Sequence, residues 1–144
     1  MRLFLFGWLL LMLSTLVHGE QNVQVQDAWV RLPPPGATIG VAYLTLTAKQ
    51  RMTLTSAKSP AAESVELHSM TMNGGVMRMR HLPVLELKTG TPVKLEPGGY
   101  HLMLINLKKP LQVGDPVQLD LNFMQGKRLA DRVRVQATVK ASPD

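Results

Sequence analysis

Short segments of alternating or β-branched residues, separated by glycine and proline turns, run through the chain from residue 20 onward. Strands that recur in this way are typical of antiparallel sandwiches. The predicted strands are residues 23–31, 38–47, 52–56, 64–72, 76–82, 100–107, 117–124 and 129–139. Residues 100–107 are apolar on both faces, which predicts a central strand. The pattern therefore predicts an all-β fold, a β-sandwich with Greek-key connections.

The N-terminal segment has the organisation of a secretory signal peptide. Arg2 supplies a short positive region, residues 3–17 are almost wholly apolar, and we expect cleavage after Gly19. An uncleaved anchor helix is the alternative, but the apolar run is short for a span. Since no cysteine is present at the cleavage site, a lipoprotein is excluded. We therefore expect residues 1–19 to be a signal peptide and residues 20–144 to form one periplasmic domain without a stable membrane anchor.

Charge and cysteine content narrow the classes of protein further. The formal net charge is +6, and removal of Arg2 with the signal peptide lowers it to +5. A basic exported domain is not expected to bind nucleic acid; the charge favours solubility, an anionic membrane surface or an acidic partner. The chain has no cysteine. No disulfide can therefore support the fold, and no thiolate can act as a metal ligand.

Histidine and methionine are concentrated in residues 68–103. This region holds three of the four histidines and five of the nine methionines. They are His68, His81, His101, Met70, Met72, Met77, Met79 and Met103. Imidazole and thioether ligands without a thiolate suit Cu(I) better than other common biological metals. The composition therefore predicts a Cu(I)-binding module, with the rest of the chain as its scaffold.

Alternation along the strands predicts which of these side chains share a face. The shared faces are His68 with Met70 and Met72, His81 with Met77 and Met79, and His101 with Met103. The sequence Asn-Gly-Gly at residues 73–75 is a strong hairpin turn that pairs the first two of these strands. Three strands can thus bring imidazoles and thioethers to one place.

The spacing of four residues in this region resembles a known motif. Ten residues separate His68 from Met79, and twenty-one separate Met79 from His101, which is followed after one residue by Met103. The surrounding sequences are VELHSM, NGGVMRMR and LEPGGYHLMLINLKKPLQVGDPV. Together they resemble the PCuAC (DUF461) family of periplasmic copper chaperones, over essentially the whole of residues 20–144.

The resemblance implies a cupredoxin-like β-sandwich that binds one Cu(I) through His68, Met79, His101 and Met103. It implies a carrier and not an enzyme. The copper would be delivered to the Cu(A) site of cytochrome c oxidase subunit II, alongside a Sco-type thioredoxin-like protein. We expect a monomer. Some family members have a His/Met-rich C-terminal tail that takes up Cu(II). This chain ends in KASPD, so a Cu(II) role is not implied here.

The remaining side chains of the region have simpler interpretations. Met70, Met72 and Met77 are interpreted as core fillers or as a soft rim around the site in preference to direct ligands. His81 is interpreted as a surface histidine, although its shared face with Met79 makes it a reserve ligand.

Other functions remain as alternatives. General periplasmic copper buffering or resistance would use the same four residues. A metal-free exported interaction module would use none of them. A blue-copper protein is nearly excluded because its site needs a cysteine thiolate. A hydrolytic zinc site would need carboxylates beside histidines. The nearby acids have no recognisable spacing; they are Glu63, Glu66, Glu86 and Glu96.

Overall fold

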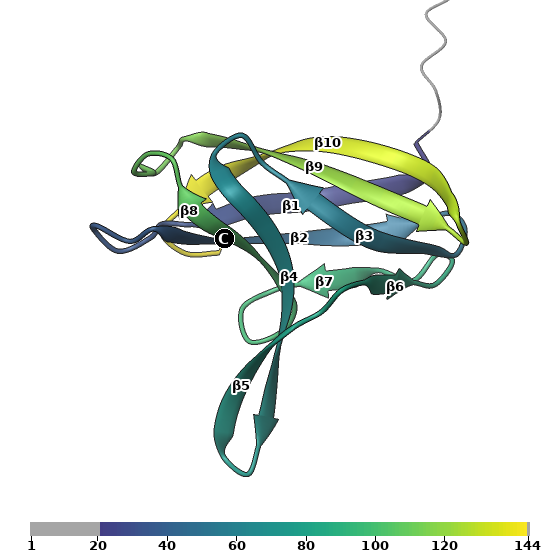
Figure 1. Cartoon of the computed structure of the whole chain (residues 1–144), viewed down its shortest axis with the longest axis horizontal. Helices are drawn as coiled ribbons and strands as arrows, with labels where there is room; N and C mark the ends of the chain where they lie inside the picture. Colours follow the sequence, from purple (N-terminus) through teal and green to yellow (C-terminus); the bar gives the residue numbers. More distant parts are fainter. Residues whose placement is uncertain (1–20, 144) are drawn as a thin grey trace, which may run out of the picture.

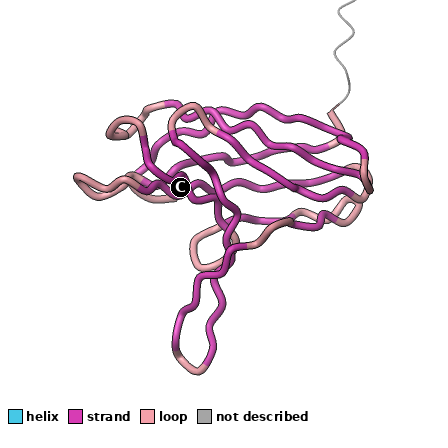
Figure 2. Tube along the Cα trace, viewed as in Figure 1, coloured by secondary structure: helices cyan, strands magenta, loops and turns pink. Residues whose placement is uncertain are grey.

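The computed structural model describes residues 21–143, which form ten strands and no helix (Figure 2). The predicted signal peptide lies outside these residues. The strands are β1 (Val23–Arg31), β2 (Ile39–Ala48), β3 (Met52–Lys58), β4 (Ala62–Asn73), β5 (Val76–His81), β6 (Leu85–Leu87), β7 (Val93–Leu95), β8 (His101–Leu107), β9 (Pro116–Gln125) and β10 (Arg128–Lys140). Within the described range no helix could span a membrane.

The strands form one continuous ladder that curls into a sandwich (Figure 1). Their order is β5-β4-β8-β2-β1-β10-β9-β3-β6, and β7 pairs with β2. A bridge between Ala57 and Val65 joins β3 to β4 and closes the ladder. Strands β1 and β10 run parallel, and the other pairs are antiparallel. The expected all-β sandwich is confirmed, and β8 is central, between β4 and β2.

Two short strands differ from the sequence-based prediction. Residues 83–99 are rich in turn residues, and no strand was expected there. The structure forms β6 and β7 in this segment, each three residues long. They form because Leu87 pairs with Met52 and Leu95 pairs with Leu44, which buries both leucines. Three residues are too few to show an alternating pattern in a sequence.

One buried apolar cluster holds the domain together. It draws on every strand except β5 and contains leucine, valine and alanine with one phenylalanine and one methionine. Its largest fully buried members include Phe123, Leu44, Leu54, Leu102 and Leu119. Because the chain has no cysteine, apolar burial of this cluster is the main source of stability.

A two-stranded arm leaves this body (Figure 1). We define the arm as residues 69–81, the outer half of β4 and all of β5. Beyond His68, β4 pairs only with β5 among the strands, and every residue of β5 is exposed. Gly74 and Gly75 close the hairpin with φ of 59° and 78°. Both are left-handed, as a two-residue type I′ turn requires, so the predicted turn is confirmed.

Candidate metal centre

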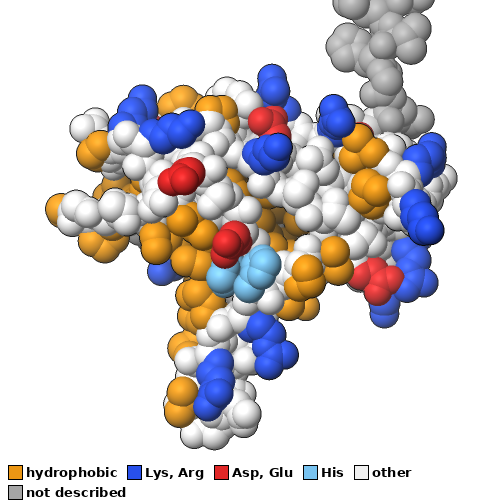
Figure 3. Space-filling view, viewed as in Figure 1, with side chains coloured by type: hydrophobic (Ala, Val, Ile, Leu, Met, Phe, Trp, Pro, Cys, Tyr) orange, Lys and Arg blue, Asp and Glu red, His pale blue; other side chains and the backbone are white. Residues whose placement is uncertain are grey.

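Three histidines lie in a row across three neighbouring strands at the root of the arm. The strand register pairs His68 of β4 with His81 of β5 on one side and with His101 of β8 on the other. The ring centroids are 5.5 Å apart for His68 and His81, and 5.7 Å apart for His68 and His101. Figure 3 shows histidine side chains where the arm leaves the body. We call these residues the histidine row.

Hydrogen bonds fix the orientation of the imidazole rings of His68 and His101. His68 Nε2 lies 2.9 Å from Glu66 Oε2, and His101 Nδ1 lies 3.2 Å from the carbonyl oxygen of Gly99. A carbonyl only accepts, so His101 Nδ1 carries the proton. An ionised carboxylate likewise accepts from His68 Nε2–H. In the neutral rings, the remaining nitrogens are therefore acceptors. They are Nδ1 of His68 and Nε2 of His101.

These two nitrogens have no hydrogen-bond partner among the described residues, and both are buried. His101 is only 4% exposed, and the side chain of His68 is 13% exposed. An unpartnered buried polar atom costs about 1–3 kcal/mol. A metal ion would satisfy both lone pairs, and the outer hydrogen bonds are those that commonly orient metal-binding histidines.

The structure brings the four predicted ligands to one face of β5, β4 and β8. Met103 follows His101 by two residues and pairs with Glu66 and Val41. Met79 precedes His81 by two residues on β5 and pairs with Met70. Met103 is half-buried, whereas Met79 is 51% exposed. The site therefore has a buried side on β8 and an open side on the arm.

Imidazole and carboxylate side chains alone do not supply a complete set of metal ligands at the histidine row. Within residues 21–143, no group of three or more histidine, cysteine, aspartate or glutamate side chains could hold a metal ion. Any metal bound at the histidine row would need sulfur ligands as well. Thioethers and imidazoles form a donor set for a soft monovalent cation.

Glu66 was missed by the sequence analysis, which found no recognisable spacing among the acids. The structure makes it the hydrogen-bond partner of His68. The available signal was parity, because residues two apart on a strand share a face. His81 is exposed, as expected for a surface histidine, but it also belongs to the histidine row.

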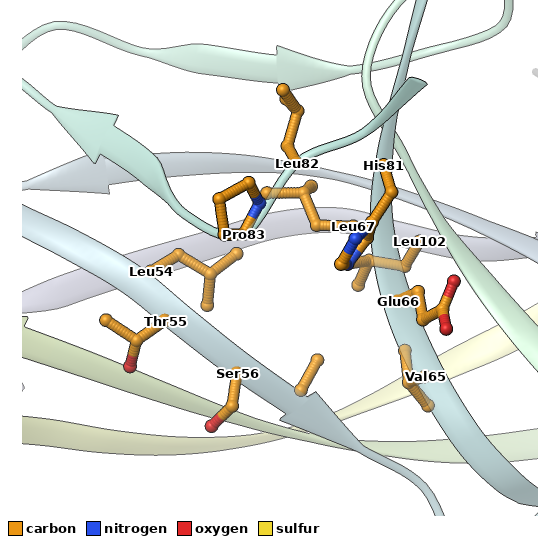
Figure 4. A pocket seen from close by; sticks show the side chains of 11 residues that line it. Leu54, Thr55, Ser56, Val65, Glu66, Leu67, His81, Leu82, Pro83 and Leu102 are labelled. Atoms are coloured by element: carbon orange, nitrogen blue, oxygen red, sulfur yellow. The ribbon is translucent and has the colours of Figure 1, made fainter. Parts of the chain in front are cut away.

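A small pocket of about 120 Å³, lined by both polar and apolar side chains, adjoins His81 of the histidine row. Figure 4 shows His81 and Glu66 at its edge, with Leu54, Leu67 and Pro83 along its walls.

Two methionines do not fill the core. Met72 is 70% exposed and Met77 is 51% exposed, and both lie on the arm. The core-filler interpretation is therefore wrong for these two residues. The alternative interpretation, a soft rim around the site, remains for both. Met52, by contrast, is 2% exposed and belongs to the apolar cluster.

Burial lowers the pKa of His101 below its ordinary value; the Gly99 hydrogen bond opposes the shift and the charge of His68 adds to it. Between the lowered pKa of His101 and the ordinary histidine pKa of about 6.5, the unfolded chain therefore binds more protons than the folded one. We expect the metal-free protein to lose stability as the pH falls from about 6.5 towards the lowered pKa of His101, with little change above pH 7. Urea denaturation across this range measures it. A His101→Leu variant with an unchanged slope would contradict the assignment.

Comparison with known families agrees with the fold. The family model described as "Putative lipoprotein LpqE-like" matches residues 23–139. The protein Lxx21020 of Leifsonia xyli subsp. xyli (strain CTCB07) is 33% identical over 116 residues, which are 78% of this chain and 70% of that protein.

Solved structures of similar proteins are also available for comparison. The Cu(I) form of DR1885 from Deinococcus radiodurans is 35% identical with a TM-score of 0.65, over 86% of this chain and 82% of that one. The copper-bound PCuAC domain from PmoF2 is 24% identical with a TM-score of 0.68, over 84% of this chain and 94% of that one. The second likeness concerns the fold alone. This chain therefore belongs to the LpqE-like (DUF461) family, and its β-sandwich is the cupredoxin-like fold of PCuAC domains.

Proposed function

We propose that this protein is a periplasmic copper carrier that binds one Cu(I) through His68, Met79, His101 and Met103. The observation that carries the proposal is the pair of buried, unpartnered imidazole nitrogens at the histidine row. They face the strand side that also carries the two thioethers. The family relationship supports it, since the Deinococcus relative has been solved with Cu(I).

The asymmetry of the site suits a carrier. His101 is held rigidly by burial and by Gly99, so it keeps its place while copper enters or leaves. Met79 is exposed on the arm and can be exchanged for a ligand of another protein. Thioethers are neutral and bind Cu(I) without a thiolate, so release does not require protonation of a sulfur ligand. Copper is the cargo here, and no catalytic step is proposed.

Delivery is the finer part of the proposal. We propose the Cu(A) site of cytochrome c oxidase subunit II as the acceptor, with a Sco-type thioredoxin-like partner. Its test mixes the copper-loaded protein with a metal-free soluble Cu(A) domain and follows copper by gel filtration and metal analysis. Transfer to the domain supports delivery. Retention of all copper by the carrier would instead support general copper buffering.

The experiment that tests copper binding is anaerobic Cu(I) titration against a competing chelator. The His68→Ala/Met79→Ala double variant is compared with the unchanged protein, and Met124→Leu on β9 is the matched control. We expect one tight equivalent in the unchanged protein and in the control, and none in the double variant. Absence of competitive binding in all three would leave a metal-free interaction module.

Replacing Met103 with leucine separates a ligand from a packing residue. Leucine keeps the approximate volume and removes the sulfur, so we expect the stability to change by less than about 1.5 kcal/mol. Loss of an outer-shell partner typically costs roughly 10–100-fold in metal affinity, and loss of a ligand is expected to cost at least as much. Chelator competition and urea denaturation measure the two effects. Strong destabilisation with unchanged copper affinity would make Met103 a core residue.

A further inference from the structure

Four methionines form two facing pairs along one side of the arm. Met70 pairs with Met79, and one step further out Met72 pairs with Met77. Facing residues on antiparallel strands have their Cβ atoms about 4.5–5.5 Å apart. Residues two apart on one strand share a face and lie about 6.5 Å apart. Three flexible bonds per side chain let neighbouring thioethers of such a ladder converge.

Packing does not explain the outer part of this ladder. Met72 is 70% exposed and Met77 is 51% exposed, and no residue of β5 is buried. Large apolar side chains on a two-stranded ribbon without a core add little to its stability. Figure 3 shows apolar side chains along one edge of the arm and Lys or Arg along the other. The arm thus presents its sulfurs to solvent on a face separate from its guanidinium groups.

The chemistry of this face matches one class of ligand. Met70, Met72 and Met77 offer three neutral soft donors and no hard oxygen or nitrogen ligand. Such a set selects Cu(I) over Zn²⁺, Mg²⁺ or Cu(II). Arg78 on the opposite face has only N–H donors and cannot compete for the metal. Met79 adjoins the set and is itself a ligand in the proposed inner site, so the two groups of donors are continuous.

We propose that Met70, Met72 and Met77 form a second, weaker Cu(I) site on the arm, through which copper reaches the histidine row. The site itself stands on the arm geometry alone; its role as an entry step rests on the proposed carrier function. Copper bound at the outer thioethers would move inward by exchanging one thioether for Met79. It would then gain His68 and His101, whose unpartnered nitrogens make the inner site the stronger one.

The test uses protein labelled with ¹³C at the methionine methyl groups and titrated anaerobically with Cu(I). We expect the Met79 and Met103 signals to move with the first equivalent, and the Met72 and Met77 signals to move with a second. A Met72→Leu/Met77→Leu variant is expected to keep the first equivalent and lose the second. Met52→Leu/Met124→Leu, two similar changes in the body, is the matched control and is expected to keep both.

The outcomes separate the inner from the outer site. In a His68→Ala/His101→Leu variant, we expect Met72 and Met77 to move with the first copper added, because the outer site needs no histidine. If Met72 and Met77 remain unmoved up to several equivalents, the second site is refuted while the inner site is untouched. If they move but Met79 and Met103 never do, the outer site stands and the carrier site fails.

The entry role has its own kinetic readout. Stopped-flow loading of the inner site from a Cu(I) chelate is expected to be about tenfold slower in Met72→Leu/Met77→Leu, with the final affinity unchanged. Equal loading rates in this variant and in the Met52→Leu/Met124→Leu control would refute the entry path. The arm would then bind copper without passing it to the histidine row.

Discussion

A His101→Leu variant is expected to lose the tight Cu(I) equivalent and yet to fold at least as stably as the unchanged protein. The two effects have one cause. His101 Nε2 is buried and unpartnered without metal, so its removal relieves a cost of about 1–3 kcal/mol. The lost hydrogen bond to Gly99 is worth about 0.5–1.5 kcal/mol. The Gly99 carbonyl stays partnered, because Met70 N–H also donates to it at 3.2 Å.

The midpoints of these two ranges differ by about 1 kcal/mol, so the expected net change in the free energy of unfolding is a gain of about 1 kcal/mol. The expected loss of copper affinity exceeds the roughly 100-fold that removal of an outer-shell partner can cause. Urea denaturation and chelator competition measure the two quantities on the same samples. His81→Leu is the matched control, since that histidine is exposed. A variant that is destabilised by several kcal/mol and retains copper would make His101 a structural histidine.

Phe123→Ala is expected to be the most destabilising single change in the body. Phe123 is fully buried on β9, between β3 and β10. Truncation of a buried phenylalanine costs about 3–5 kcal/mol, a large part of the total of about 5–15 kcal/mol for a domain. No disulfide is present to limit the loss.

Copper should restore part of this loss without involving Phe123. Free Cu(I) at about 100 times the dissociation constant stabilises the folded state by about 2.7 kcal/mol. Thermal melting of the variant with and without Cu(I) measures the recovery. A cost below about 1 kcal/mol would show that β9 repacks around the cavity, and a lower copper affinity in the folded variant would show that the core and the site are coupled.

Much of this architecture was predictable because its strands are long and marked by strong turns. Residues 23–31 match β1 at both ends, and the hairpin at Gly74 and Gly75 forms as expected. The faces of β4, β5 and β8 also follow from alternation alone. What alternation could not provide was the register between β4 and β8, which lie far apart in sequence. That register places His101 opposite His68 and completes the histidine row.

The features that the sequence did not predict all depend on contacts or packing in the folded chain. Strand parity places Glu66 on the same face as His68, but the hydrogen bond between them also depends on side-chain rotamers, which parity does not encode. Strands β6 and β7 exist only because longer strands offer them partners. Met72 and Met77 look like core residues by type, and only the departure of the arm from the body exposes them.

The separation of the arm from the body divides the chain into two regions under different constraints. The six residues of β5 extend about 20 Å at a strand rise of 3.3 Å per residue, and none of them belongs to the buried cluster of the body. Substitutions at the exposed positions of this strand are therefore expected to cost less folding stability than substitutions in the buried cluster of the body. The body is thus constrained by folding and the arm by the chemistry of its side chains, so the same scaffold could tolerate change in the exposed hairpin that its buried cluster would not.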